Sequence, residues 1–279
     1  MSQRPARPPL RYHGGKWKLA SWIVRHFPPH QVYLEPFGGG ASVLLNKPRA
    51  ELETYNDLDG EVVNFFRTLR ERPADLVLAL ELTPWSHAEY ELSHEPSTDP
   101  LEQARRFFVR SWQSIGGPTA QWRNGWRYQV KRGNWHNAAD LWCELEHLYA
   151  VAERLRGVQI ECRDAFELIP RYDAPEVLIY LDPPYPHETR SRWKGKAYAQ
   201  ELSDDDHARL AELARASSAY VIISSYPSEL YYELYGSHGW RWVETTARTN
   251  SRHMVRTECL WLSPRTLAAL DGGLFPLGA

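Results

Sequence analysis

The 279-residue sequence contains only three cysteines, no apolar run of about 18 residues and no group of histidines with metal-ligand spacing. Cysteines without paired spacing argue against a disulfide framework and against a cysteine-rich zinc site, and they indicate a reducing compartment. The N-terminus, MSQRPARPPL, lacks the apolar segment of a secretion signal, and a membrane-spanning helix needs about 20 apolar residues. We therefore expect a cytoplasmic protein without a membrane span or a bound metal.

Acidic residues are missing from three stretches of the chain, although the net charge is only −2. Residues 103–139 hold seven Lys or Arg, residues 189–200 hold four and residues 245–257 hold three, without any Asp or Glu. The first stretch also contains Trp112, Trp122, Trp126 and Trp135. Because basic side chains contact phosphates and aromatic rings stack on bases, this segregation predicts a nucleic-acid-binding surface.

Strand and helix patterns alternate along most of the chain. Strand patterns occur at 31–35, 51–57, 158–162, 176–181, 220–226 and in a final pair over 240–263. Helical patterns occur at 16–27, after the glycine-rich turn up to 46, and at 59–72, 137–157 and 203–216. Residues 73–136 interrupt the alternation. The pattern predicts an α/β fold with a largely parallel sheet, helices on both faces and a closing antiparallel pair.

An acidic residue marks the end of four predicted strands. These residues are Glu35, Asp57, Asp164 and Asp182. Ligands of open α/β sheets bind outside the carboxyl ends of the strands. The four acids therefore predict one site at that edge of the sheet.

The first strand leads into a glycine-rich turn, EPFGGGAS. Gly38, Gly39 and Gly40 let the backbone approach a ligand closely, because they lack a Cβ atom. The turn has neither the G-x-G-x-x-G spacing of a dinucleotide site nor the G-K-[ST] of a phosphate loop. Asp57, at the next strand end, is placed to accept hydrogen bonds from a ribose diol. These features suggest a nucleoside cofactor without a phosphate to bind, and S-adenosylmethionine meets that description.

Four motifs in a fixed order make the resemblance to a known family specific. RYHGGKWKLA, LEPFGGGASVLLN, YNDLD and DPPY together resemble the Dam-like (D12 class, alpha group) DNA adenine-N6 methyltransferases, with the phage or restriction-modification branch closest. The resemblance covers residues 11–70 and 158–262, whereas 73–136 shares only position and character. One departure is Ala41, which stands where many relatives have a second glycine.

The resemblance implies a site-specific enzyme that transfers the methyl group of S-adenosylmethionine to N6 of a flipped-out adenine in double-stranded DNA. It implies a Rossmann-like catalytic domain (1–72 and 137–279), a mostly helical target-recognition insertion (73–136) and a DNA-contacting hairpin (187–200). The expected product is S-adenosylhomocysteine, the expected location is the bacterial nucleoid or the cytoplasm of a phage-infected host, and the expected state is a monomer or weak dimer. A cognate restriction endonuclease is a candidate partner. An RNA adenine-N6 methyltransferase and an inactive DNA-binding relative remain alternatives.

The resemblance also assigns cofactor-binding residues. Tyr12 would pack on the cofactor, Lys16 would pair with its methionine carboxylate and Glu35 would face its amino group. Asp57 would accept from the ribose, while Asp164 and Phe166 would read the adenine. The full predicted set is Tyr12, Gly14, Gly15, Lys16, Glu35, Pro36, Phe37, Gly38, Gly39, Gly40, Ser42, Asp57, Asp164, Phe166 and Asp182.

The DPPY tetrad, Asp182, Pro183, Pro184 and Tyr185, has a chemistry that suits an exocyclic amine. The N6 lone pair is delocalised into the ring, and two hydrogen-bond acceptors would draw the nitrogen toward tetrahedral geometry. Asp182 can supply one acceptor and the Pro183 carbonyl the other, since a prolyl nitrogen carries no competing N–H. Tyr185 offers a face for stacking. A base must leave the duplex to reach such a site. The predicted DNA contacts are Arg123, Arg127, Lys131, Arg132, Arg190, Arg192, Lys194 and Lys196.

Overall fold

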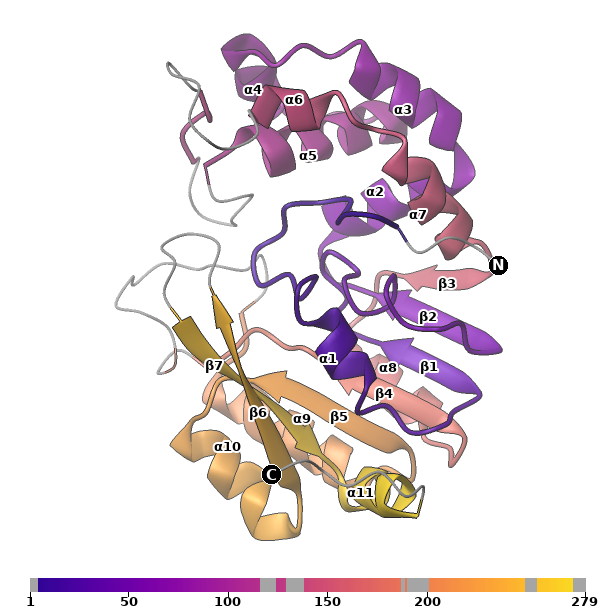
Figure 1. Cartoon of the computed structure of the whole chain (residues 1–279), viewed down its shortest axis with the longest axis vertical. Coiled ribbons are helices and arrows are strands. Elements are labelled where there is room, and N and C mark those ends of the chain that lie inside the picture. Colours follow the sequence, from indigo (N-terminus) through magenta and orange to yellow (C-terminus); the bar gives the residue numbers. More distant parts are fainter. Residues whose placement is uncertain are drawn as a thin grey trace.

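A seven-stranded mixed sheet forms the centre of the computed structural model, which describes residues 5–115, 124–128, 138–186, 189, 201–248 and 255–272. The strands are β1 (Val32–Glu35), β2 (Leu52–Asn56), β3 (Val158–Glu161), β4 (Val177–Leu181), β5 (Tyr220–Ser225), β6 (Arg241–Arg248) and β7 (Val255–Leu262). Their order is β3-β2-β1-β4-β5-β7-β6. The first five run parallel, while β7 is antiparallel to both β5 and β6. The predicted fold class is confirmed (Figure 1).

Alternate side chains of the central strands enter two hydrophobic cores, one on each face of the sheet. In β4, Leu178 and Tyr180 belong to one core and Ile179 and Leu181 to the other. All five residues of β4 are buried, as expected for a central parallel strand. Helices α1 (Ala20–Val24), α2 (Gly60–Glu71) and α11 (Pro264–Asp271) contribute to the first core. Helices α8 (Ala165–Leu168), α9 (Asp204–Ala216) and α10 (Glu229–Leu234), with the 3-10 turn Ile169–Tyr172, cover the second.

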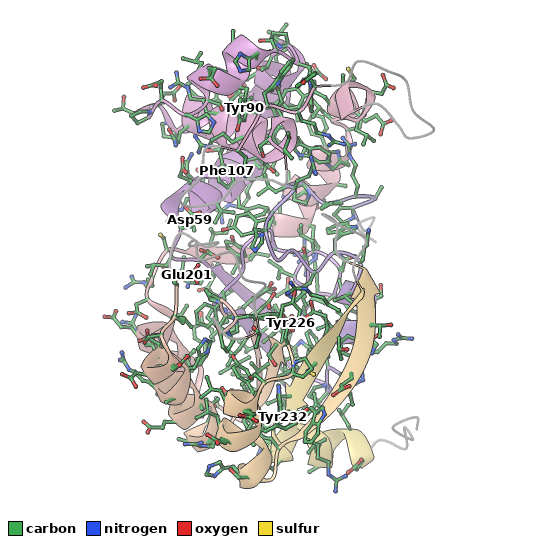
Figure 2. All side chains as sticks on the ribbon, turned by 90° about the vertical axis from the view of Figure 1, so that its left-hand side faces the viewer. Asp59, Tyr90, Phe107, Glu201, Tyr226 and Tyr232 are labelled. Carbon is green, nitrogen blue, oxygen red and sulfur yellow. The ribbon has the colours of Figure 1, made fainter. Side chains whose placement is uncertain are left out.

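A helical layer stands above the β3 edge of the sheet (Figure 1). It contains α3 (Pro73–Glu81), α4 (His87–Leu92), α5 (Pro100–Gln113), α6 (Ala138–Trp142) and α7 (His147–Leu155). Helix α2 packs against both α5 and α7 and joins this layer to the sheet. Figure 2 shows Tyr90 and Phe107 in the helical layer, Tyr226 and Tyr232 in the sheet half, and Asp59 and Glu201 at the level between them. Among the residues described, no helix is long and apolar enough to cross a membrane.

The single helix predicted over 137–157 is wrong, because the structure has two helices there, α6 and α7. The Arg7 guanidinium donates hydrogen bonds to the carbonyl oxygens of Leu141 and Glu144. A continuous helix would use these oxygens for its own backbone ladder. The break also lets the Trp142 indole donate to the Thr83 carbonyl at 2.9 Å.

The helix predicted after the glycine-rich turn is also wrong, since residues 42–46 form a series of turns. The Leu44 amide donates to the Glu35 carboxylate at 2.9 Å, and the Asn46 side chain donates to the Ser42 carbonyl at 2.7 Å. Side-chain partners therefore replace part of the helical ladder, while the Leu45 and Lys47 amides still donate to the carbonyls of Ala41 and Val43. The helix predicted over 16–27 is likewise shorter, with only Ala20–Val24 in α-helical form.

Candidate functional site

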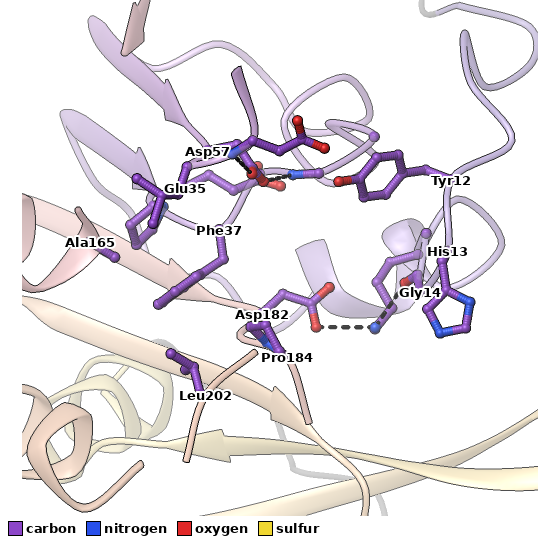
Figure 3. A pocket seen from close by; sticks show the side chains of 18 of the residues that line it. Tyr12, His13, Gly14, Glu35, Phe37, Asp57, Ala165, Asp182, Pro184 and Leu202 are labelled. Carbon is purple, nitrogen blue, oxygen red and sulfur yellow. Dashed lines mark hydrogen bonds and ion pairs between the residues drawn. The ribbon is translucent and has the colours of Figure 1, made fainter. Parts of the chain in front are cut away.

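A pocket of about 270 Å³ lies at the carboxyl ends of the parallel strands. The four strand-end acids, Glu35, Asp57, Asp164 and Asp182, all line it. Figure 3 shows Tyr12 and Asp57 along one side and Asp182 and Pro184 on the opposite side. The parallel register of β1, β2, β3 and β4 thus brings together residues that are far apart in the sequence.

All fifteen residues of the predicted cofactor-binding set line this pocket. Only part of the DPPY tetrad lines the pocket. Asp182 and Pro184 do so, whereas Pro183 and Tyr185 are not among its lining residues. The pocket lining includes seven acids and three bases. The acids are Glu35, Asp57, Asp59, Asp164, Asp182, Glu201 and Asp206, and the bases are Lys16, Arg163 and Arg209. Such a lining favours a cationic ligand.

The glycine-rich turn is packed too closely for side chains. A Cβ atom at Gly38 would lie 2.2 Å from the Tyr55 ring, and one at Gly39 would lie 2.9 Å from the Tyr12 ring. Tyr12 therefore rests directly on the turn. Ala41 has φ 53°, and among the described residues it is the one non-glycine residue with a positive φ. The turn therefore accommodates the methyl group of Ala41 in a left-handed conformation that ordinarily favours glycine.

Glu35 is a buried carboxylate at the end of β1, with 2% of its surface exposed. Its Oε2 atom accepts hydrogen bonds from the Tyr33 hydroxyl at 2.8 Å and from the Leu44 amide. The pKa of Glu35 is raised to about 8. Burial is the main cause and the neighbouring Asp182 carboxylate acts in the same direction, while the two hydrogen bonds oppose the shift. Beneath it, the Lys47 ammonium lies 4.5 Å from the Tyr33 ring centroid.

A buried ion cluster supports Lys47 in that position. Glu53 accepts from Lys47 at 2.6 Å and from two nitrogens of Arg154 at 2.6 and 2.9 Å. All three side chains are nearly inaccessible to solvent. Buried charges are tolerated when they are paired and hydrogen-bonded. The cluster therefore holds Lys47 against the ring of Tyr33, whose hydroxyl donates to Glu35.

Asp57 follows β2 and binds the backbone of the glycine-rich turn and of the residues just before α2. Its carboxylate accepts from the Gly39 amide at 2.7 Å and from the Asp59 amide at 2.9 Å. Burial raises the pKa of Asp57 to about 6, although these backbone hydrogen bonds lower it. Asp59 caps α2 through the Glu61 amide. Asp164 caps α8 through the Phe166 amide at 2.8 Å, so it serves as a helix cap and also lines the pocket.

Asp182 follows β4 and forms an ion pair with Lys16. The Lys16 ammonium lies 3.1 Å from Asp182 Oδ1 and donates to the Gly14 carbonyl at 3.0 Å. It also lies 4.7 Å from the centroid of the Tyr185 ring. Burial raises the pKa of Asp182, and the Lys16 ammonium opposes that shift. Lys16 therefore covers two groups that were predicted to contact a base.

The sequence analysis did not predict several residues of the site. Leu202, Asp206 and Arg209 line the pocket from the start of α9, and the Arg209 guanidinium lies 4.6 Å from the Phe166 ring centroid. A capping box at Ser203 begins α9 and could have located them, because the helix that follows a parallel strand in the chain begins at the carboxyl edge of the sheet. Arg163 and Glu201 also line the pocket.

The charge pattern of residues 103–139 was misleading in its first part. Arg105 and Arg106 pair with Glu102 at 2.7 and 2.6 Å, and Arg110 pairs with Glu61. Trp112 is buried, and its indole donates to the Pro9 carbonyl at 3.0 Å. These residues hold the helical layer together and do not form a surface for bases.

Arg127 is the predicted DNA contact that lies within the described residues. It is half-buried and lies close to Arg11. Burial and the Arg127 charge together lower the pKa of Arg11 to about 10. The buried Nη1 atom of Arg11 has no hydrogen-bond partner in the part of the chain that the structure describes. The other predicted DNA contacts lie outside the described residues: Arg123, Lys131, Arg132, Arg190, Arg192, Lys194 and Lys196. Most of the predicted hairpin over 187–200 also lies outside them.

The fold and the pocket define an α/β protein of the S-adenosylmethionine-dependent methyltransferase type. The sequence profile of the D12 class N6 adenine-specific DNA methyltransferases matches residues 12–250, and the chain belongs to this family. The chain is 27% identical over 259 residues to a DNA adenine methylase of Serratia marcescens, covering 88% of this chain and 93% of that protein.

Two further relatives give the same result. The chain is 26% identical over 238 residues to a DNA adenine methylase of Salmonella typhi, and 26% identical over 242 residues to one of Vibrio cholerae. Both alignments cover 81% of this chain and 83% of the relative. The protein is thus an adenine-specific DNA methyltransferase.

Proposed function

We propose that the pocket binds S-adenosylmethionine. We also propose that the DPPY residues 182–185 after β4, here called the Asp182 tip, hold the amino group of a flipped adenine in double-stranded DNA. The observation that carries this proposal is the convergence of the glycine-rich turn and four strand-end acids on one pocket that also contains Asp182. The pocket would place the cofactor and the tip of β4 next to each other.

The residues present fit this cofactor. Its sulfonium and ammonium groups are cationic, which suits a lining with seven acids and three bases. Tyr12 packs directly on Gly39, where a Cβ atom would lie 2.9 Å from the ring, so the ring and the bare backbone of the turn line the pocket side by side. The nearly buried Phe166 ring supplies an apolar surface for an adenine.

Each end of the cofactor has a residue to hold it. Glu35 would hold the ammonium group, Lys16 the carboxylate and Asp57 the ribose hydroxyls, while Asp164 and Phe166 would hold the adenine. When bound, the cofactor supplies an electrophilic methyl group on a sulfonium. Lys16 has to leave Asp182 and the Tyr185 ring before a base can use them, and its proposed role at the carboxylate would draw it away.

The Asp182 tip would then prepare the adenine amine. The Asp182 carboxylate and the Pro183 carbonyl can each accept one N6 hydrogen, which localises the lone pair on nitrogen. Tyr185 would support the base by stacking, which is worth about 1–3 kcal/mol per base and offsets part of the cost of flipping. Transfer would depend mainly on positioning and on exclusion of water.

Asp57→Ala should weaken binding of S-adenosylmethionine by about 10- to 100-fold, because it removes a charged acceptor from the ribose. The matched control is Asp205→Ala, an exposed acid that does not line the pocket. Isothermal titration calorimetry measures both affinities, and thermal melting checks that both variants fold. Equal affinities in the wild type and the Asp57 variant would place the cofactor elsewhere.

We propose that Arg127 and Arg11 contact a DNA phosphate. Burial lowers the pKa of both guanidinium groups, and the Arg127 charge lowers that of Arg11 further; an anion between two such groups would offset these costs. The unpartnered Nη1 atom of Arg11 supports this role. The same proposal includes a recognition insertion over 73–136, a DNA-contacting hairpin over 187–200, a partner endonuclease, a monomeric or weakly dimeric state and a cytoplasmic location.

Arg127→Ala should weaken DNA binding several-fold and reduce the slope of log K against log salt by about one, since one phosphate contact is lost. Arg156→Ala is the control, because Arg156 is exposed at the far end of α7 and pairs with Glu153. Binding to a duplex is measured by fluorescence anisotropy at several salt concentrations. An unchanged slope would show that Arg127 does not contact the DNA.

A further inference from the structure

We infer that Glu258 on β7 is a positioning residue that holds the Tyr185 ring of the DPPY tetrad in place for the target base. The inference rests on the proposed function, in which Tyr185 supports that base. Glu258 is not part of any motif identified in the sequence. Its position follows from the antiparallel pairing of β7, in which Cys259 lies opposite Ser225 of β5.

A buried hydrogen bond joins the two side chains. The Tyr185 hydroxyl donates to Glu258 Oε2 at 3.0 Å, and the two residues are only 4% and 8% exposed. A buried hydroxyl that loses its acceptor destabilises the position of its side chain. The bond thus links the segment after β4 to β7, 73 residues further along the chain.

Charged groups near the Glu258 carboxylate act on its pKa in opposite directions. Burial and the Asp182 charge raise the pKa of Glu258, while the Lys16 and Arg256 charges and the bond from Tyr185 lower it. Glu258 therefore shares the Lys16 charge with Asp182. When Lys16 turns toward a cofactor carboxylate, Glu258 keeps its hydrogen bond to Tyr185.

Aromatic packing holds the ring from another side. The Tyr226 ring meets Tyr185 edge-on, with centroids 4.6 Å apart and an interplanar angle of 79°. The Arg256 guanidinium in turn lies 5.0 Å from the Tyr226 ring centroid. Once Lys16 leaves the face of Tyr185, Tyr226 still packs against the ring and Glu258 still accepts the hydrogen bond from its hydroxyl.

A double-mutant cycle tests this role. Glu258→Ala and Tyr185→Phe should each lower kcat about tenfold, and the double variant should also lose about tenfold, because both changes remove the same bond. Glu258→Gln retains an acceptor oxygen and should recover most of kcat. The dissociation constant for S-adenosylmethionine should stay unchanged in all variants, since neither residue lines the pocket.

The assay uses the full-length protein, unmethylated plasmid DNA and tritiated cofactor, with Glu244→Ala as the control because Glu244 is an exposed acid on the neighbouring strand β6. If Glu258→Ala does not fold, Glu258→Leu replaces it, since leucine fills a similar volume. Wild-type kcat in the folded variant, or a hundredfold loss in the double variant, would overturn the inference. If the wild type itself transfers no methyl group to adenine, the proposed function fails instead.

Discussion

Asp182→Ala is expected to lower the single-turnover rate of methyl transfer by at least about 100-fold. The variant lacks the carboxylate that would accept one N6 hydrogen, and loss of one such interaction in a transition state typically costs 10²- to 10³-fold. A hundredfold loss corresponds to about 2.7 kcal/mol of barrier. The fold should persist, because burial already disfavours the Asp182 charge.

Binding of S-adenosylmethionine to the Asp182→Ala variant should stay within a few-fold of the wild type. Lys16 keeps its hydrogen bond to the Gly14 carbonyl, and Glu35 and Asp57 remain in place. Asp182→Asn, which retains one acceptor oxygen, should show an intermediate rate. Calorimetry measures the affinity and rapid quench with tritiated cofactor measures the rate. Full activity in the alanine variant would remove Asp182 from the chemistry.

Glu35→Gln is expected to stabilise the fold at high pH. The pKa of about 8 in the folded protein lies above the ordinary value of 4.5, so the folded protein keeps a proton that the unfolded chain releases. Stability of the wild type therefore falls as the pH rises from about 4.5 to about 8. Glutamine has no such proton, and its oxygen can still accept from Tyr33 and Leu44. We expect the variant to gain roughly 4 kcal/mol at pH 8 and little near pH 4.5.

Urea unfolding at several pH values between 5 and 8 measures this gain. Glu212→Gln is the control, because Glu212 is an exposed acid on α9 and its replacement should leave the pH dependence of stability unchanged. A Glu35 variant whose stability follows the wild type at every pH would contradict the assigned pKa.

The same substitution should weaken binding of S-adenosylmethionine by at least about tenfold at pH 7.5, because the ammonium loses its counter-charge. Wild-type affinity should rise between pH 6 and pH 7.5 as Glu35 ionises, whereas the affinity of the variant should lack the contribution of Glu35. Calorimetry across that range tests the difference between the two proteins. Equal affinities would separate Glu35 from the cofactor.

Features that depend on short stretches of chain were predictable from the sequence. The strands that lead to Glu35 and Asp182 are apolar runs followed by an acid, and parallel topology alone brings such ends together. The glycine-rich turn was readable for the same reason, since Gly38 and Gly39 lack the Cβ atoms that the packed rings exclude.

Features that depend on distant partners were not predictable. Glu258 meets Tyr185 only because β7 inserts antiparallel beside β5, and no local pattern reports that pairing. Arg7 divides the helix pattern of 137–157 although it lies 134 residues before Leu141. The first part of the basic stretch was misread because its acidic partners lie outside it, as Glu61 does for Arg110.

The identity of the methylated base tests the central claim most directly. Purified protein is incubated with duplex DNA and S-adenosylmethionine carrying a tritiated methyl group, and the nucleosides are separated after digestion. We predict label in N6-methyladenine for the wild type and almost none for Asp182→Ala. Label found only in cytosine or only in an RNA substrate, or equal labelling by the two proteins, would contradict the account.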